Sequence, residues 1–452
     1  MATFAFELFN HPHAMTRLLL PLLTLIFLGS KLYAQTPPVR LTPAEAVRIA
    51  LESSYDIRIS RADADIARLN NTRANAGMLP TVNFVAGENL AVNGVQYQEF
   101  FNGTTVNRYG VLSNNLTAGV QLAWTLFDGR RMYIAKNRLE QLEALGQLNL
   151  QNQVQQTTAA VLLGYYDIVR GRLQERAIAE VITLNEERLR IAEARLAAGF
   201  AAQTDALQAR IDLNQRRADL LNQQAATAAA KRALNRLLVR DPATQFEVEE
   251  NLDNTYAPER NALAQKILAQ NPGLLSLQKN AEVAALTVDE NRTLSKPRIV
   301  GNGQFNALRS DNAAGILLSN TQAGLTLGAT LTIPLYTGGN LRRQVETAQL
   351  SAQQAALRTD AQRQVFETEL DNQLAFFQVQ KQVLALEEEN VKNARENLSV
   401  STERFRLGQT NALETQVAQN TLEQALSRRN LVLFNLKTAE LGLRTLSGDL
   451  AY

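Results

Sequence analysis

AWTLFDGRR, at residues 123–131, recurs in pattern as TIPLYTGGN at residues 332–340, and this repetition decides the fold. Each copy closes a stretch of alternating apolar residues, and each is followed by a long segment without proline. Aligning Gly129 with Gly338 gives an offset of 209 residues. Self-similarity at a fixed offset indicates an internal repeat.

A second pair of motifs has the same spacing. ARLAAGFAAQTDALQAR surrounds Gly199, ERFRLGQTNALETQVAQ surrounds Gly408, and these glycines are again 209 residues apart. We therefore divide the chain into a first structural repeat over residues 35–245 and a second over residues 246–452. Each repeat is expected to contain a helix, two strands, a long helix and a final helix.

The strands are predicted from a period of two. Apolar residues alternate with polar or small ones from Leu116 to Leu126 and again from Leu325 to Leu335, and partner strands are expected at about 81–92 and 298–308. Strands of about 11 residues cross a bilayer when tilted. The alternative is a soluble antiparallel sheet with one face in water.

The number of strands decides whether one chain could form a closed transmembrane sheet by itself. Open sheet edges leave backbone groups unpaired in lipid, so a transmembrane sheet has to close. Four strands per chain cannot close alone, because the smallest barrels have about eight strands. Two copies would supply 8 strands and three copies 12.

Long helices account for most of the chain. Alanine, leucine, glutamine, glutamate and arginine dominate the segments between the strands, and these residues favour helix. The helix from about Arg130 to Ala198 would span about 100 Å at 1.5 Å per residue. Gly199 and Gly408 should therefore lie at the end farthest from the strands. The six expected helices cover about 42–78, 130–198, 203–239, 258–294, 340–406 and 411–446.

Residues 1–34 are predicted to be a signal peptide. Arg17 precedes an apolar run from Leu18 to Leu28, which is too short to span a bilayer as a helix, and cleavage is expected after Ala34. Met15 is an alternative start.

The mature chain lacks the usual catalytic and metal-binding side chains. Its only histidines, His11 and His13, lie in the predicted signal peptide, and the chain has no cysteine. This excludes His or Cys zinc sites, Ser-His and Cys-His catalysis, disulfides and a lipid anchor on cysteine. We expect no enzyme, no metal and no cofactor. An enzyme using carboxylates, such as a glycosidase, remains the rival catalytic class.

Charge and hydropathy narrow the partners. The chain has 46 basic and 44 acidic residues, so its net charge indicates no nucleic-acid partner. No stretch after the predicted signal peptide reaches 18 consecutive apolar residues, so no transmembrane helix is expected.

With these motifs in hand, the chain resembles the TolC-like outer membrane efflux protein family. The duplicated order, the LFDG and PLYTGG strand exits and the two glycine turns carry the resemblance across nearly the whole mature chain. It implies an all-α-dominated fold in which duplicated long-helix hairpins form an α-barrel tunnel. Four strands per chain would contribute to a trimeric 12-stranded β-barrel in the bilayer of the cell outer membrane.

The resemblance also implies function and partners. Members of the family are passive conduits from the periplasm to the exterior in tripartite efflux or type I secretion systems. A periplasmic adaptor and an inner-membrane transporter complete the assembly. The exported substrate, and whether the pump uses protons or ATP, are not indicated. A periplasmic coiled-coil scaffold without a pore is the alternative, but it does not explain the repeated strands.

Site residues follow from the resemblance at the second turn. The family's latch tyrosine and arginine correspond here to Phe405 and Thr410, and its two pore acids correspond to Glu414 and Val417. The acid after the first turn is Asp205. Glu414 and Asp205 are thus the expected pore constriction, although both could be ordinary helix N-terminal charges. Loss of the tyrosine and arginine leaves the latch unexplained.

Two further groups of residues have expected roles. Gly199 and Gly408 mark the periplasmic turns and, with Phe405 and Thr410, the expected adaptor contact; simple turn formation is the alternative for the glycines. Trp124 and Tyr336 are expected at the membrane interface, where amphipathic rings gather, with plain packing as the alternative.

Overall fold

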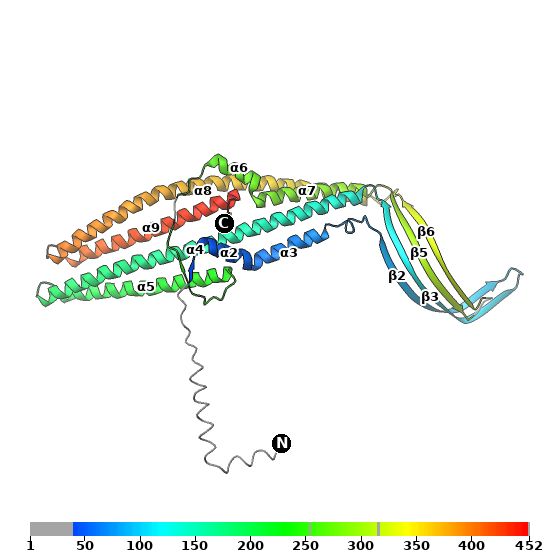
Figure 1. The fold of residues 1–452 in the computed structure, drawn as a ribbon, viewed down its shortest axis with the longest axis horizontal. Coiled ribbons are helices and arrows are strands. Elements are labelled where there is room, and N and C mark those ends of the chain that lie inside the picture. Colours follow the sequence, from blue (N-terminus) through cyan, green and yellow to red (C-terminus); the bar gives the residue numbers. More distant parts are fainter. Residues whose placement is uncertain (1–38, 253–254, 314–316, 451–452) are drawn as a thin grey trace, which may run out of the picture.

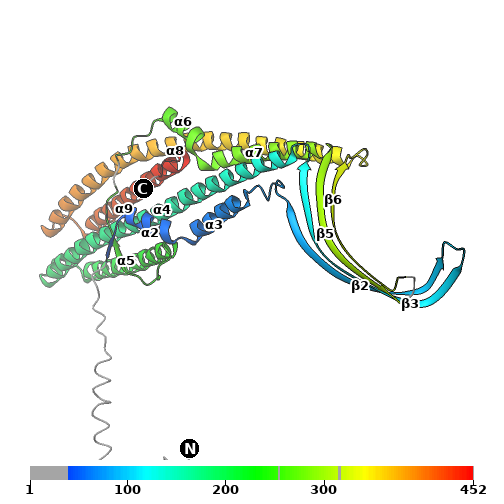
Figure 2. The same ribbon diagram turned by 45° about the vertical axis from the view of Figure 1, so that its right-hand side comes forward.

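The chain forms a long helical rod with a curved sheet at one end. The computed structural model describes residues 39–252, 255–313 and 317–450, so the predicted signal peptide lies outside the described residues. Figure 1 shows the helices running side by side along the rod, with the sheet bending away at its far end. The same curvature of the sheet is plain in Figure 2.

Two helices of equal length form the spine of the rod. α4 (Arg131–Ala197) and α8 (Asn340–Arg406) each have 67 residues, or about 100 Å at the usual rise. Each turns back at the tip into a shorter helix, α5 (Gln203–Leu237) or α9 (Ala412–Ser447). The predicted long helices are confirmed. Among the described residues, no helix is both long and apolar enough to cross a membrane.

The first helix of each repeat was predicted as continuous, and this is wrong. The predicted helix over 42–78 is α2 (Pro43–Ser53) followed by α3 (Tyr55–Asn70), and the one over 258–294 is α6 (Arg260–Gln270) followed by α7 (Pro272–Thr293).

Asn271 shows why the second of these helices breaks. Pro272 has no amide hydrogen and disfavours helical backbone in the residue before it. Asn271 accordingly adopts an extended conformation, and its side chain accepts a hydrogen bond from the Leu274 amide at 2.8 Å. Its amide group also donates to the Leu446 carbonyl at 2.9 Å, which ties the break to α9.

The main sheet is antiparallel and contains four strands in the order β2-β3-β5-β6. The β3–β5 pair joins the two repeats, while β2 and β6 are its edges. The strands are longer than predicted, because the segment 94–110, which lies between the strands expected at 81–92 and 116–126, mostly continues the β2–β3 hairpin. Valine and tyrosine in that segment favour strand. The four strands are β2 (Thr81–Glu99), β3 (Thr105–Phe127), β5 (Arg298–Asn312) and β6 (Ser319–Thr332).

The strand register gives this sheet one apolar and one polar face. Residues of one pairing row share a face, and alternate rows point to opposite faces. We call the apolar face the one carrying the rows Val82–Leu122–Gly303–Leu327, Phe84–Val120–Phe305–Leu325 and Ala86–Ala118–Ala307–Ala323. We call the polar face the one carrying rows such as Asn83–Gln121–Gln304–Thr326.

The apolar face has the height of a membrane. It ends outward at the row Glu88–Leu116–Arg309–Thr321. From Ala323 to Thr332, the last residue of β6, the strand rises about 31 Å, or about 23 Å along a membrane normal at a tilt of about 40°. Apolar bands of barrel proteins are about 25 Å tall.

A small second sheet fastens the connection between the repeats to the middle of the rod. β1 (Val39–Leu41) and β4 (Phe246–Val248) pair in parallel. The buried Tyr165 hydroxyl of α4 donates to the Leu41 carbonyl at 2.9 Å and accepts from the Glu249 amide at 2.8 Å. Burial raises the pKa of Tyr165.

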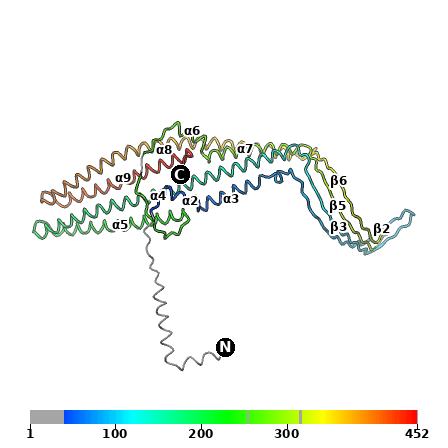
Figure 3. The backbone as a smooth tube through the Cα atoms, in the orientation of Figure 1, coloured from blue at the N-terminus to red at the C-terminus, as the bar shows by residue number. Residues whose placement is uncertain are grey.

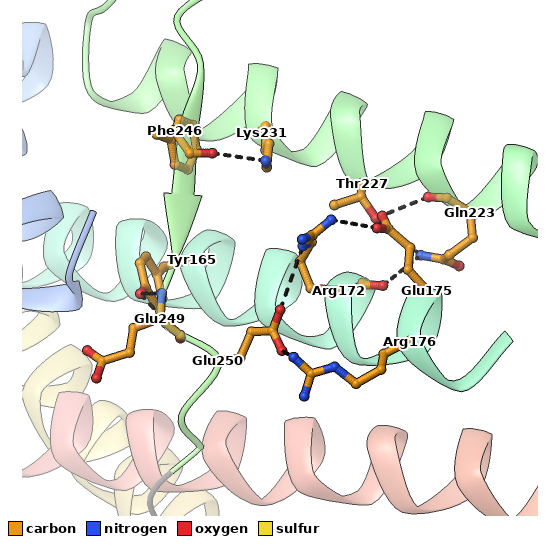
Figure 4. Close-up of polar contacts among 11 residues, drawn as sticks. Tyr165, Arg172, Glu175, Arg176, Gln223, Thr227, Lys231, Phe246, Glu249 and Glu250 are labelled. Carbon is orange, nitrogen blue, oxygen red and sulfur yellow. Dashed lines mark hydrogen bonds and ion pairs between the residues drawn. The ribbon is translucent and has the colours of Figure 1, made fainter. Parts of the chain in front are cut away.

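Charged side chains extend this attachment along α4 and α5. Lys231 of α5 donates to the Phe246 carbonyl at 2.9 Å, while Arg172 and Arg176 of α4 both pair with Glu250 (Figure 4). The acidic connection is therefore held against a basic strip of the first helical hairpin.

Candidate functional site

The two glycine turns lie together at the tip of the rod. Gly199 and Gly408 have positive φ values of 78° and 74°, which glycine adopts without strain. Both turns lie at the end of the molecule farthest from the sheet, as the helix lengths predicted (Figure 3). A side chain at Gly199 would meet only open space, so this glycine is needed for its backbone conformation.

Arg195, in the last turn of α4, ties the two turns together. Its guanidinium donates to the Phe405 carbonyl at 2.9 Å and to the Phe200 carbonyl at 3.3 Å. The same group lies 5.0 Å from the centre of the Phe405 ring, a cation–π contact. Phe405 is buried, so its side chain serves this packing. Sequence reasoning missed Arg195, whose only signal was a basic residue beside the first turn.

Glu414 has partners within its own chain. Arg404, on α8, pairs with the Glu414 carboxylate at 2.7 Å, and the Thr410 hydroxyl donates to it. The Glu414 amide donates to the Asn411 side chain at 3.1 Å, which caps α9. Thr410, expected as an adaptor contact, thus holds Glu414. The charge of this carboxylate is partly offset by Arg404 before any second chain is considered.

Asp205 is half-buried in the first turn of α5 and lies at the edge of a cavity of about 290 Å³. The acid that joins the hairpins there is Asp212, about two helical turns further along α5. Asp212 pairs with the buried Arg188 of α4 and accepts a hydrogen bond from Gln416 of α9 at 2.8 Å. Asp205 lies near Arg188 and Gln416, but Asp212 is the acid that bonds to them.

Farther from the tip, Arg216 continues the link between α5 and α9. It pairs with Glu423 at 2.8 Å and donates to the Asn420 side chain at 3.0 Å. Burial raises the pKa of Glu423, and the opposing attraction of Arg216 is the smaller effect. Ion pairs between the hairpins therefore extend well beyond the turns.

Trp124 and Tyr336 lie at the opposite end of the rod, where the strands meet the helices. The Trp124 indole donates to the Met78 carbonyl at 3.0 Å, and the residue is 44% exposed. Tyr336, in the connection that follows β6, is 90% exposed. Both aromatic residues thus lie near the end of the apolar face that adjoins the helices. At the opposite end of the rod, Val417, which occupies the position of the second pore acid, is exposed.

Comparison with known proteins gives a consistent result. The profile of the outer membrane efflux protein family matches residues 46–239 and 263–449. The outer membrane efflux protein BepC of Brucella suis biovar 1 is 24% identical over 392 residues, covering 82% of this chain and 80% of that protein.

Solved structures share the fold. The outer membrane protein VceC of Vibrio cholerae superposes with a TM-score of 0.76 at 16% identity, covering 90% of this chain and 96% of that one. The CmeC outer membrane channel of Campylobacter jejuni has a TM-score of 0.77 at 15% identity, with 90% and 85% covered.

Proposed function

The chain belongs to the outer membrane efflux protein family, and from this membership we propose that three copies of it close into one export channel. The protein is an outer-membrane channel subunit of a tripartite efflux system. In the proposed trimer, twelve strands form the barrel, and the helical hairpins form a tunnel that reaches into the periplasm.

One observation carries the proposal of closure. The four-stranded sheet has an apolar face of membrane height, yet β2 and β6 have no strand beyond them among the described residues. Unpaired backbone groups cost several kcal/mol each in hydrocarbon, so such edges are not tolerated there. Pairing β6 of one chain with β2 of the next removes both edges once the ring closes.

The rod supports the rest of the assembly. Members of the family are non-enzymatic transport conduits, and we propose that this chain likewise has no catalytic activity. A tunnel about 100 Å long, open at the barrel and narrowed at the Gly199 and Gly408 turns, would receive cargo at its tip. Its proposed partners are a periplasmic adaptor at the turns and an inner-membrane transporter that selects the cargo.

The test is to purify the chain from outer membranes in detergent and measure its mass by light scattering. A particle of three times the chain mass that forms conducting pores in planar bilayers is the expected result. A particle that remains a monomer, or a trimer that does not conduct, would reject the proposed channel.

A further inference from the structure

The polar face of the sheet is almost free of charge. It carries mainly amide, hydroxyl and glycine residues along the four strands, from the row of Asn93 down to the helices. Within this stretch, from the Asn93 row to the helices, Arg298, the first residue of β5, is the only charged position that the structure describes. In the proposed barrel the polar face lines the lumen, because the apolar face has to meet lipid.

Arg298 lies in a basic setting. It borders a cavity of about 470 Å³ whose lining also includes Lys296, Arg131, Arg138, Asp128 and Glu290. Glu290 already pairs with Arg131 at 3.2 Å and with Arg138 at 2.9 Å. One oxygen of Asp128 accepts from the Met132 amide at 2.9 Å.

Two basic side chains at this cavity, Arg298 and Lys296, are available to bind an external ligand. Arg298 donates only a long hydrogen bond, 3.4 Å, to the Thr125 hydroxyl, and within the described part of the chain neither Arg298 nor Lys296 forms an ion pair. Four basic side chains thus stand against two carboxylates. The cavity has an excess of positive charge beside the lumen-facing side of the sheet.

We propose that Arg298, with Lys296 beside it, forms a cationic collar where the barrel meets the tunnel, and that the collar binds multiply charged anions in transit. This inference rests on the proposed trimer. Twelve strands spaced about 4.8 Å apart and tilted about 40° give a ring with a backbone radius of about 12 Å. The three guanidinium groups then lie within about one Debye length of the axis at 0.1 M salt, which is about 10 Å.

The experiment uses the purified full-length trimer in planar bilayers at 0.1 M KCl, with inorganic tripolyphosphate as the probe. Tripolyphosphate added on the barrel side should block the current. In Arg298→Gln the blocking concentration should rise about tenfold, the loss expected for three exposed charge pairs. Arg309→Gln is the matched control: Arg309 is on the same strand but in a row of the opposite face, and it pairs with Asp311 at 2.9 Å.

A second variant keeps the test sensitive if Arg298→Gln assembles poorly. The chain has no cysteine, so Arg298→Cys introduces a single thiol. A cationic methanethiosulfonate reagent should restore block by tripolyphosphate, and an anionic one should not.

The outcomes separate the collar from the channel itself. Pores that conduct normally but show equal block in wild type and Arg298→Gln, or no block in wild type, would overturn the collar and leave the channel intact. Loss of block in Arg309→Gln to the same degree would overturn it too. Absence of any pore would instead contradict the proposed function.

Discussion

Arg195 offers an answer to the absence of the tyrosine and arginine that the family resemblance leads one to expect at the tip. Its bonds go to main-chain carbonyls of both turns, so they do not depend on the side chains at positions 405 and 410 beyond the ring of Phe405. An arginine with several fixed donors suits this double contact better than a lysine would.

Replacing Arg195 should therefore loosen the tip. In Arg195→Gln we expect a single-channel conductance about twofold or more above that of wild type, because the charge-assisted bond to Phe405 between the hairpins and the one to Phe200 within the first turn are both lost. Arg195→Lys should be intermediate. The control is Arg190→Gln, since Arg190 is exposed on the same helix and pairs locally with Glu187. Equal conductance in Arg195→Gln and Arg190→Gln would exclude a latch at Arg195.

Glu414 and Arg404 form a matched pair for testing the pore constriction. If Glu414 faces the pore, Glu414→Gln removes a negative charge and leaves the positive charge of Arg404 unpaired, so the preference of the pore for cations should fall. Arg404→Gln frees the carboxylate and should raise that preference, each by roughly twofold for charges at these distances in water. Reversal potentials in a KCl gradient measure both. Unchanged potentials in both variants would make the pair an ordinary surface ion pair.

At the scale of elements, the sequence predicted what is periodic and missed what is short. Helix-favouring residues without proline from 131 to 197 and from 340 to 406 predict the two 67-residue helices. β1 and β4 have three residues each, too few for any period, and they exist because Tyr165 and Lys231 hold their backbones.

The candidate site was predicted less completely than the long helices, because most of its contacts join segments that are far apart in the sequence. Glycine at both turns is visible in the sequence because its backbone freedom is a property of one residue. The contacts of Arg195 and Asp212 depend on how one hairpin packs against the other, and no local pattern encodes that. Glu414 was predicted as a site residue from its position, and this stays a prediction, while its ion-pair partner Arg404 became evident only in the fold.

The two faces of β5 can be tested directly. Single cysteines placed from 299 to 307 in this cysteine-free chain should alternate in their reaction with a water-soluble thiol reagent in intact outer membranes. Positions 300, 302, 304 and 306 should react, and positions 299, 301, 303, 305 and 307 should be protected by lipid. Uniform reactivity along the strand would mean that this sheet does not separate water from lipid.

At the scale of the whole molecule, closure depends on contacts that one chain cannot make. Within one chain β2 and β6 are separated by two strands, about 14 Å apart, which is beyond the reach of a disulfide. A disulfide between them can form only between neighbouring chains.

This gives a test of the ring. Asn83→Cys on β2 should be combined in turn with cysteines at 322, 324, 326, 328 and 330 on β6, to sample the unknown register. At least one pair should give covalent dimers and trimers on a non-reducing gel. Each single-cysteine variant is the control and should migrate as a monomer. If no pair cross-links, β2 and β6 are not neighbours across the interface.

The unpaired edges also have a kinetic consequence. In the proposed trimer, a newly secreted chain cannot pair the edges of β2 and β6 by itself, so its stable insertion has to wait for two other chains. The rate of channel formation should therefore depend on chain supply more steeply than in direct proportion. At low supply, most chains would remain as unassembled intermediates whose apolar face needs a chaperone. Gene dosage would then act on this pore as a threshold, with few channels below it and rapid assembly above it.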